Sequence, residues 1–217
     1  ESVEFAHPVA SLLSRSFRCI EFYGNNYVLD APRTDALVLP GSFNPLHDGH
    51  LKMMQAAKKQ TGQKGLFELS VVNPDKGVLD EATVQRRIEQ FSNRGIPLLL
   101  TRASLFRDKA ALMSNCTFLV GYDTAIRIVQ PKYYGDSETN MAMELGFIRN
   151  RGCRFLVAGR TVNVGGSKTF LSLKDAQIPD YLTDLFIGLD GFRLDISSTE
   201  IRSRRKNDSR SEEHTSE

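Results

Sequence analysis

Gly41-Ser42-Phe43-Asn44-Pro45-Leu46-His47-Asp48-Gly49-His50 is the stretch that decides the fold. It follows an apolar run at residues 36–40, which predicts a buried strand, and it precedes residues 51–59, which predict a helix. A turn alone does not need two histidines three residues apart. A glycine lets backbone N–H groups approach an anion, a helix N-terminus attracts negative charge, and imidazoles donate hydrogen bonds to phosphate oxygens. The joint therefore predicts a phosphate-binding loop.

The composition is that of a globular protein with room for a sizeable core. The 217 residues are 41% hydrophobic and 25% charged, and the net charge of +2 gives no reason to expect a nucleic-acid partner. No apolar run approaches the roughly 20 residues of a membrane span, and no secretory signal precedes residue 20. Three widely spaced cysteines, Cys19, Cys116 and Cys153, read as reduced core thiols, which favours the cytoplasm. The sequence leaves a homo-oligomer open.

The two ends of the chain differ from its middle. In residues 1–35, two β-prone runs flank Gly24-Asn25-Asn26, which predicts a hairpin, and a short helix is expected within residues 8–17. We expect this segment to be an N-terminal extension or the remnant of an upstream module, because the chain lacks an initiator Met and residues 31–34 read as a linker. Residues 36–205 are the predicted main domain. Residues 206–217 are polar, predict a disordered tail, and end in a run that resembles a translated sequencing adapter, so we interpret them as an artefact.

Strands and helices alternate along the main domain. Apolar runs predict further strands at residues 66–72, 97–101, 117–121, 154–159 and 192–196, with helices at residues 82–91, 105–113, 122–129, 138–150 and 197–204. This alternation predicts an α/β fold, a Rossmann-like parallel sheet with right-handed crossovers and helices on both faces. Ligands of such sheets bind at the carboxyl ends of the strands. The loops at residues 40–50, 73–76, 121–124 and 196–200 all follow predicted strands, so we expect the site there.

Two separated motifs resemble one family. The GSFNP turn followed by His47-Asp48-Gly49-His50 is similar to the signature of the HxGH nucleotidyltransferase superfamily, and Ile196-Ser197-Ser198-Thr199-Glu200-Ile201-Arg202 resembles the ISSTxIR motif of its adenylyltransferase branch. The resemblance covers residues 36–204 and is closest to nicotinate and nicotinamide mononucleotide adenylyltransferases. It implies transfer of a nucleoside monophosphate, AMP from ATP, onto a phosphorylated small-molecule acceptor, with release of pyrophosphate. A pyridine mononucleotide is one such acceptor.

The resemblance also assigns roles to residues. It implies that His47 and His50 donate to the triphosphate and to transition-state oxygens, and that Arg202 adds a cation. It implies Mg²⁺, carried mainly on the triphosphate; the chain itself shows no zinc spacing and no predicted metal ligands, and Asp48 reads as a spacer. Residues 197–200 also read as a helix capping box, which is compatible with phosphate binding. The residues that would bind the nucleotide are Gly41, Ser42, Phe43, Asn44, Gly49, Asp123, Ile196, Ser197, Ser198 and Thr199.

The sequence offers several candidates for the residues that bind the acceptor. Lys76, Arg86 and Tyr122 are the candidate acceptor-binding residues, with Arg87 as an alternative to Arg86, although both arginines also fit a solvated helix face. Asp123, in a G-x-D pattern that the family uses for ribose, also fits a helix N-cap. We expect Arg127 to pair with Asp123 or Asp136, and Arg160 is a further candidate beside the adenine.

One departure from the family bears on the acceptor, and it leaves alternatives open. The chain has no Trp to stack on a pyridine ring, so Phe106 or Tyr122 would have to do so, or the acceptor is not a pyridine nucleotide. A cytidylyltransferase using CTP is the near alternative. Class I aminoacyl-tRNA synthetases share an HxGH-type site but also need a KMSKS-like loop, which the sequence lacks. A domain that binds nucleotides for regulation without catalysis is the alternative from another class.

Overall fold

A computed structural model of the chain describes residues 8–75 and 77–193. These residues form an eight-stranded sheet of order β12-β9-β8-β3-β4-β7-β1-β2 and two small ribbons, β10–β11 and β5–β6. The strands are β1 (Cys19–Tyr23), β2 (Asn26–Leu29), β3 (Ala36–Pro40), β4 (Lys64–Ser70), β5 (Val72–Asn73), β6 (Gly77–Val78), β7 (Leu98–Thr101), β8 (Thr117–Gly121), β9 (Arg154–Ala158), β10 (Arg160–Val164), β11 (Ser167–Leu171) and β12 (Phe186–Gly188). The helices are α1 (Pro8–Leu13), α2 (Asp48–Thr61), α3 (Glu81–Ser92), α4 (Phe106–Leu112), α5 (Tyr122–Ile128) and α6 (Glu138–Asn150), with 3₁₀ turns η1 (Pro131–Tyr134), η2 (Leu173–Asp175) and η3 (Asp180–Leu185).

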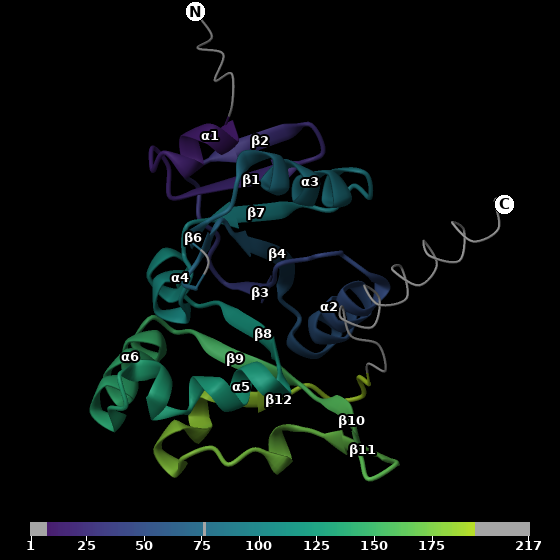
Figure 1. Ribbon diagram of the computed structural model, residues 1–217, viewed down its shortest axis with the longest axis vertical. Coiled ribbons are helices and arrows are strands. Elements are labelled where there is room, and N and C mark those ends of the chain that lie inside the picture. The colour runs from purple at the N-terminus through teal and green to yellow at the C-terminus, as the bar shows by residue number, and fades with distance from the viewer. Residues whose placement is uncertain (1–7, 76, 194–217) are drawn as a thin grey trace, which may run out of the picture.

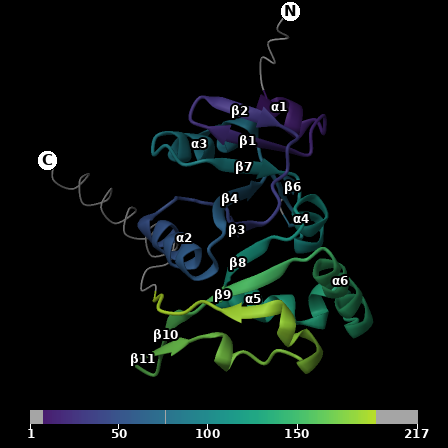
Figure 2. The same cartoon turned by 180° about the vertical axis from the view of Figure 1, so that it is seen from behind.

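The sheet is mostly parallel, which confirms the predicted α/β fold. Strands β12, β9, β8, β3, β4 and β7 run parallel to one another. From β3 the chain builds β4 and β7 on one side, and then returns to place β8 on the other side of β3. Figures 1 and 2 show the sheet along the length of the molecule, with β1–β2 at one end and β12 at the other. The order of strands therefore reverses at β3, where such folds bind their ligands.

Strand β3 separates two hydrophobic layers because its side chains alternate between the faces of the sheet. Leu37 and Leu39 belong to a buried cluster with residues of α1, α2 and α3, whereas Ala36 and Val38 belong to a second cluster with residues of α4, α5 and α6. Both faces of the central strand are buried, which is why it reads as a continuous apolar run. Helices cover both faces, as predicted.

Helix α2 begins inside the histidine motif, three residues before the predicted start. His47 is its N-cap, with extended backbone angles (φ −141°, ψ 168°). Gly62 ends it in the left-handed conformation (φ 70°), and its N–H donates to the Lys58 carbonyl at 2.9 Å, as expected of a glycine C-cap. The helix thus carries His50 in its first turn.

The N-terminal hairpin is present but lies in the main sheet. Strands β1 and β2 pair around a turn in which Gly24 has a φ of 58°, as predicted. Strand β1 also pairs antiparallel with β7, from Cys19 opposite Thr101 to Phe22 opposite Leu98. Residues 19–29 thus extend the main sheet through the antiparallel pairing of β1 with β7, whereas the predicted division of the chain at residue 35 stays a prediction. Whether they once belonged to an upstream module stays a prediction.

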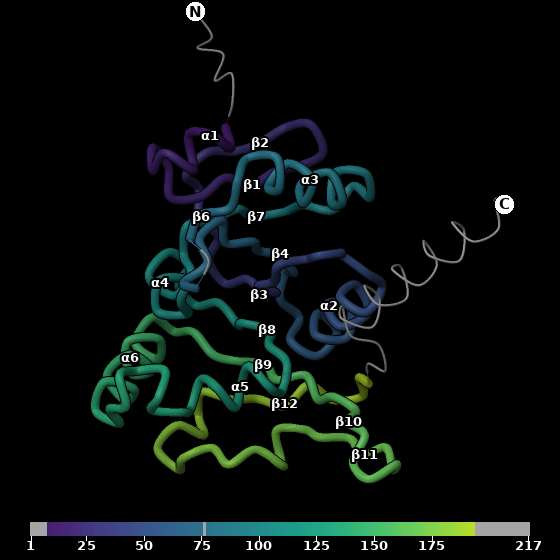
Figure 3. Tube along the Cα trace, viewed as in Figure 1, coloured from purple at the N-terminus to yellow at the C-terminus, as the bar shows by residue number. Residues whose placement is uncertain are grey.

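The region between β9 and the C-terminal motif was not predicted. Residues 160–171 form the hairpin β10–β11, and β12 extends the sheet beside β9. Figure 3 follows the chain through this hairpin and back to the sheet. The hairpin is largely exposed and polar, and β12 has three residues, so neither gives a clear apolar pattern. Of the strand predicted at residues 192–196, Phe192 and Arg193 are not in a strand, and the rest lies outside the described residues.

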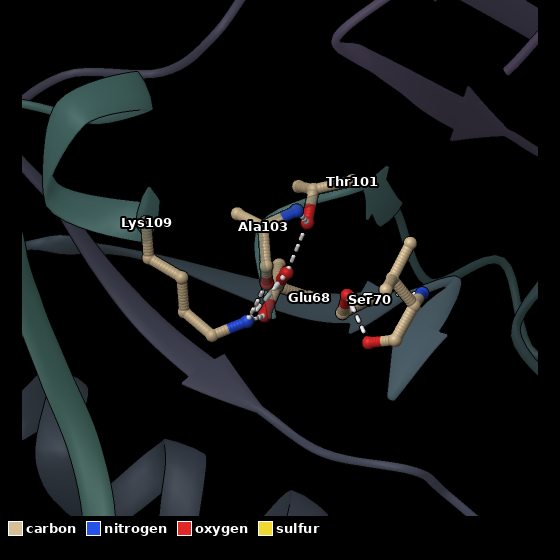
Figure 4. A network of polar contacts seen from close by, with 6 residues as sticks. Glu68, Ser70, Thr101, Ala103 and Lys109 are labelled. Atoms are coloured by element: carbon tan, nitrogen blue, oxygen red, sulfur yellow. Dashed lines mark hydrogen bonds and ion pairs between the residues drawn. The ribbon is translucent and has the colours of Figure 1, made fainter. Parts of the chain in front are cut away.

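A buried polar network fixes the sheet near its carboxyl edge (Figure 4). Glu68 on β4 is fully buried, and both of its carboxylate oxygens accept hydrogen bonds from Nζ of Lys109 on α4, at 2.9 and 2.8 Å. The Thr101 hydroxyl donates to the same carboxylate at 2.6 Å, and Lys109 Nζ also donates to the Ala103 carbonyl at 2.7 Å. Each ionised group is thus satisfied within the protein, which is the condition for burying it.

Lys109→Met should destabilise the fold by about 3–5 kcal/mol, because it leaves the Glu68 carboxylate buried without its cation. The free energy of unfolding from urea titration measures this loss. The matched control is the double variant Glu68→Gln/Lys109→Met, which removes the ion pair as a whole and should recover much of the loss. A single variant as stable as the original protein would contradict this assignment.

Candidate active site

The loop between β3 and α2 is held by its own aromatic ring. Phe43 has a φ of 45°, in the left-handed region, and its side chain is 1% exposed. Its ring packs edge to face on Phe67 and Phe91, with centroids at 5.7 and 5.1 Å. A Cβ atom on Gly41 would lie 2.9 Å from the Phe43 ring, so a glycine is needed there. The Gly41 N–H donates to the Glu68 carbonyl at 3.0 Å, so of the expected backbone cradle only Ser42 and Phe43 keep the N–H for an anion.

Helix α3 clamps the same loop through one side chain that sequence analysis missed. Gln90 Nε2 donates to the Phe43 carbonyl at 2.9 Å, and the Leu46 N–H donates to Gln90 Oε1 at 2.8 Å. A side-chain amide has both a donor and an acceptor, so this one side chain can bond a backbone carbonyl and a backbone N–H of the loop together. The loop shape is therefore set by a residue more than forty positions away in the chain.

Arg87 on α3, and Arg94 just beyond the end of this helix, contact the histidine motif as well. Arg87 Nη1 donates to Asn44 Oδ1 at 2.7 Å, and Arg94 lies 3.7 Å from the Asp48 carboxylate. Arg87 and Gln90 stand three residues apart on α3, which places them on one helix face. Arg86, the predicted acceptor ligand, instead donates to Thr83 Oγ1 at 2.8 Å on its own helix. The repeating polar spacing on an otherwise amphipathic helix was the available signal.

The two histidines cap the helix reciprocally. The Gly49 N–H donates to His47 Nδ1 at 3.1 Å, and the His47 N–H donates to His50 Nδ1 at 3.2 Å. The imidazole rings stack, with centroids 3.8 Å apart and planes inclined by 28°. Since each Nδ1 accepts a hydrogen bond, each neutral ring must carry its proton on Nε2. Both rings are therefore prepared as Nε2–H donors.

Burial keeps both imidazoles neutral. Desolvation lowers the pKa of His47, while the nearby Asp48 carboxylate acts in the opposite direction. Desolvation, and next to it the charge of His47, lowers the pKa of His50 to about 4. The edge of the His50 ring also meets Phe43, with centroids 5.2 Å apart, so an apolar wall causes part of this desolvation. At neutral pH the pair offers two hydrogen-bond donors without formal charge.

A second group of candidates follows β8, the strand beside β3. Tyr122 and Asp123 begin α5 directly after β8, and the Tyr122 hydroxyl donates to the Asp175 carbonyl at 3.4 Å. Asp123 forms an ion pair with Arg160, the first residue of β10, and both side chains are half exposed. Asp123 therefore pairs with Arg160, and among the described residues no ion pair joins Arg127 to Asp123 or Asp136. Because β3 and β8 are neighbouring parallel strands, the histidine loop and Asp123 follow their carboxyl ends at the same edge of the sheet.

The remaining predicted site residues lie outside the described residues. They are Lys76 of the candidate acceptor loop, and Ile196, Ser197, Ser198, Thr199 and Arg202 of the C-terminal motif. Their roles therefore stay predictions.

The described residues provide no ready-made metal cage. Within residues 8–75 and 77–193, no three His, Cys, Asp or Glu side chains gather as a metal site. Asp48 is 83% exposed and faces Arg94. A Mg²⁺ ion that is carried on a triphosphate, with water completing its coordination shell, fits such a site, because it needs few protein ligands.

Among residues 8–75 and 77–193, no helix is long and apolar enough to cross a membrane.

Comparison with known proteins supports the sequence motif. Residues 38–96, which include the histidine loop and α3, match the model of the family described as "Cytidylyltransferase-like". A Schizosaccharomyces pombe protein named "Putative nicotinamide mononucleotide adenylyltransferase" is 33% identical over 119 residues, which cover 49% of this chain. The matched segment spans about half, 47%, of that relative's length.

The pKa of His50 makes stability depend on pH. The unfolded imidazole binds a proton near pH 6.5 whereas the folded one does so only near 4, so the free energy of unfolding should fall by about 2–3 kcal/mol as pH drops from 6.5 to 4. Urea titrations across this range measure the fall. In the control variant His50→Asn, the amide oxygen can still accept the His47 N–H but does not titrate, so the fall should shrink to what His47 and the carboxylates contribute. Equal pH profiles for both proteins would refute the assignment.

Proposed function

We propose that this chain, which carries a cytidylyltransferase-like domain of the HxGH nucleotidyltransferase type, transfers AMP from ATP onto the phosphate of a small-molecule acceptor. The observation that carries the proposal is the pair of neutral imidazoles with protonated Nε2 atoms at the carboxyl end of β3. The site lies at the reversal of strand order, where α/β sheets bind nucleotides. No other described residues combine a helix N-terminus, two imidazole donors and this position.

The proposed reaction needs no protein nucleophile. A phosphate oxygen of the acceptor forms a bond to the α-phosphorus of ATP, the bond from that phosphorus to the β-phosphate bridging oxygen breaks, and pyrophosphate leaves with the electron pair. Catalysis then depends on alignment and on stabilising the charge that gathers on the phosphate oxygens. Mg²⁺ bound to the triphosphate supplies further charge neutralisation.

Each element around the loop contributes one part. His47 and His50 donate from Nε2 to triphosphate oxygens, and the backbone at Ser42 and Phe43 cradles them. Gly49 lies directly before His50 in the first turn of α2, and it has no side chain that would block a phosphate from reaching the helix N-terminus. The second wall of the clamp is proposed to be the segment Ile196–Arg202, with Ser197, Ser198 and Thr199 as donors and Arg202 as the cation.

The nucleoside and the acceptor are proposed from weaker signals. The Asp123 carboxylate would accept hydrogen bonds from the ribose hydroxyls. Its exposed ion pair with Arg160 would either break or leave one carboxylate oxygen for the ribose. The name of the fission yeast relative favours ATP and a pyridine mononucleotide. Of the two aromatic residues considered for ring stacking, Phe106 packs in the core against Phe118 and Phe155, with centroids at 5.5 and 5.1 Å. Tyr122 is therefore the proposed stacking residue.

The cytoplasm is the proposed location, since a reducing compartment suits the three buried free thiols at Cys19, Cys116 and Cys153. Lys76 and Arg86 stay candidate acceptor ligands. A partner copy of this chain and the absence of nucleic-acid partners stay predictions.

Pyrophosphate release tests the reaction. The purified protein with Mg²⁺ should release pyrophosphate from ATP only when nicotinamide or nicotinate mononucleotide is added, and CTP in place of ATP distinguishes a cytidylyltransferase. Binding of nucleotide without turnover on any phosphorylated acceptor would instead identify a regulatory domain and contradict the proposal.

Two substitutions of His50 separate its two nitrogen atoms. His50→Asn keeps an acceptor near Nδ1 but loses the Nε2 donor, so kcat should fall about a hundredfold to a thousandfold while the circular dichroism spectrum is unchanged. His50→Gln keeps a donor near Nε2 but loses the cap, so it should lose less kcat and more stability. The reverse order of the two kcat values would refute the role of Nε2.

A further inference from the structure

A cleft of about 670 Å³ lies between the N-terminal segment and α4, away from the histidine loop. Its walls come from the turn after α1, from the start of β5, from the two residues after β7, and from α4. It is lined by Arg15, Phe17, Arg18, Val72, Arg102, Ala103, Asp108, Ala111 and Leu112. None of these residues belongs to the candidate active site.

Arg15 occupies a backbone position that normally holds glycine. The Ser16 N–H donates to the Ser11 carbonyl at 2.9 Å and the Arg15 N–H donates to the Leu12 carbonyl at 3.1 Å, which is the Schellman pattern at the end of α1. Arg15 has a φ of 68°, in the left-handed region that disfavours a side chain. Its side chain is exposed and lines the cleft. The fold therefore tolerates an arginine where glycine would be more stable.

Two of the three arginines that line the cleft form no ion pair with a carboxylate of the described residues, so their positive charge is available to a ligand. Arg18 is paired with Asp30, at 3.0 Å. Arg102 donates to the Leu12 and Leu13 carbonyls at 3.2 and 2.9 Å, and neither it nor Arg15 has a carboxylate partner among the described residues. Asp108, which is exposed, is the carboxylate that opposes them in the cleft.

The floor of the cleft is apolar and rigid. Val72, Ala103 and Leu112 contribute carbon atoms there, together with Phe17. Ala103 is held at both ends, because its N–H donates to Thr101 Oγ1 at 3.0 Å and its carbonyl accepts from buried Lys109. The lining of the cleft thus combines an apolar part, anchored at Ala103 by two hydrogen bonds, with guanidinium groups, and guanidinium groups match the oxygens of a phosphate.

We propose that this cleft is a second ligand site, which binds a phosphomonoester that carries an apolar group. Arg15 and Arg102 hold the phosphate, and the floor around Ala103 and Leu112 receives the apolar part. The proposal is independent of nucleotidyl transfer, since it uses none of the residues assigned to that reaction.

Phenyl phosphate is the probe, titrated into the ¹⁵N-labelled full chain and followed by amide chemical shifts. We expect saturable shifts at Ala103, Ala111 and Leu112, and weaker or absent ones with phenol or inorganic phosphate, because each lacks one half of the ligand. The same titration with ATP and Mg²⁺ present should give the same shifts. Shifts confined to the amides of His47, Gly49 and His50 would overturn the proposal.

Substitutions of opposite sign sharpen the test. Arg15→Gly should weaken binding about tenfold, and should keep or raise the melting temperature because glycine suits the left-handed position. Asp108→Asn should strengthen binding about threefold by removing a repulsive charge. Lys168→Gln, on the exposed strand β11, removes a positive charge elsewhere and should leave the affinity unchanged.

Either of two results would refute the site: affinity unchanged in Arg15→Gly, or an equal loss in Lys168→Gln. If Arg15→Gly lowered the melting temperature, Arg15→Asn would repeat the test with a residue that tolerates the left-handed backbone. Binding lost in a folded Arg15→Asn supports the proposal, and binding retained in it overturns the proposal.

Discussion

The neutralisation of one buried carboxylate determines the geometry at the carboxyl edge of this sheet. Glu68 is buried on a central strand, where a lone negative charge would not be tolerated, and Lys109 approaches it from α4. The same lysine fixes the Ala103 carbonyl, and the backbone carbonyl of Glu68 accepts the N–H of Gly41, where the histidine loop begins. Through its side chain and its backbone carbonyl, Glu68 therefore links α4, the end of β7 and the histidine loop. A buried ion pair adds little net stability, but it selects a single arrangement of the elements that meet there.

The helix start and the chemistry of the loop are one structure. An ordinary N-cap uses a hydroxyl or carboxylate to accept backbone N–H groups, whereas here the accepting atoms are the Nδ1 atoms of His47 and His50. Folding of α2 therefore selects the tautomer, and burial against Phe43 keeps His50 uncharged. No separate side chain is needed to orient the rings, because the capping hydrogen bonds already fix both imidazoles and leave their Nε2 atoms outside the cap.

Sequence reasoning succeeded where the signal is local. Strand β3 and the histidine loop follow from an apolar run and from residues with a special backbone preference. The resemblance to HxGH nucleotidyltransferases is confirmed by the family match over residues 38–96. Sequence reasoning failed where contacts between segments far apart in the chain determine the structure. Gln90 could not be linked to the loop because its partners lie more than forty residues away, and β12 gains its place only by pairing with β9. The hairpin β1–β2 was predicted locally, but its partner strand was not.

That hairpin covers an edge of the sheet that could otherwise pair with strands of other protein molecules. Without it, β7 would present a row of unpaired backbone groups on an apolar strand whose residues Leu98–Thr101 are all buried, and such an edge invites pairing with other chains. The hairpin ends the sheet with the short strand β2 and places a charged pair beside it, because Arg33 binds the buried carboxylate of Glu21 at 2.8 and 2.9 Å. Truncation at residue 35 would thus expose an aggregation-prone edge, so a shortened form has to retain the segment from residue 8.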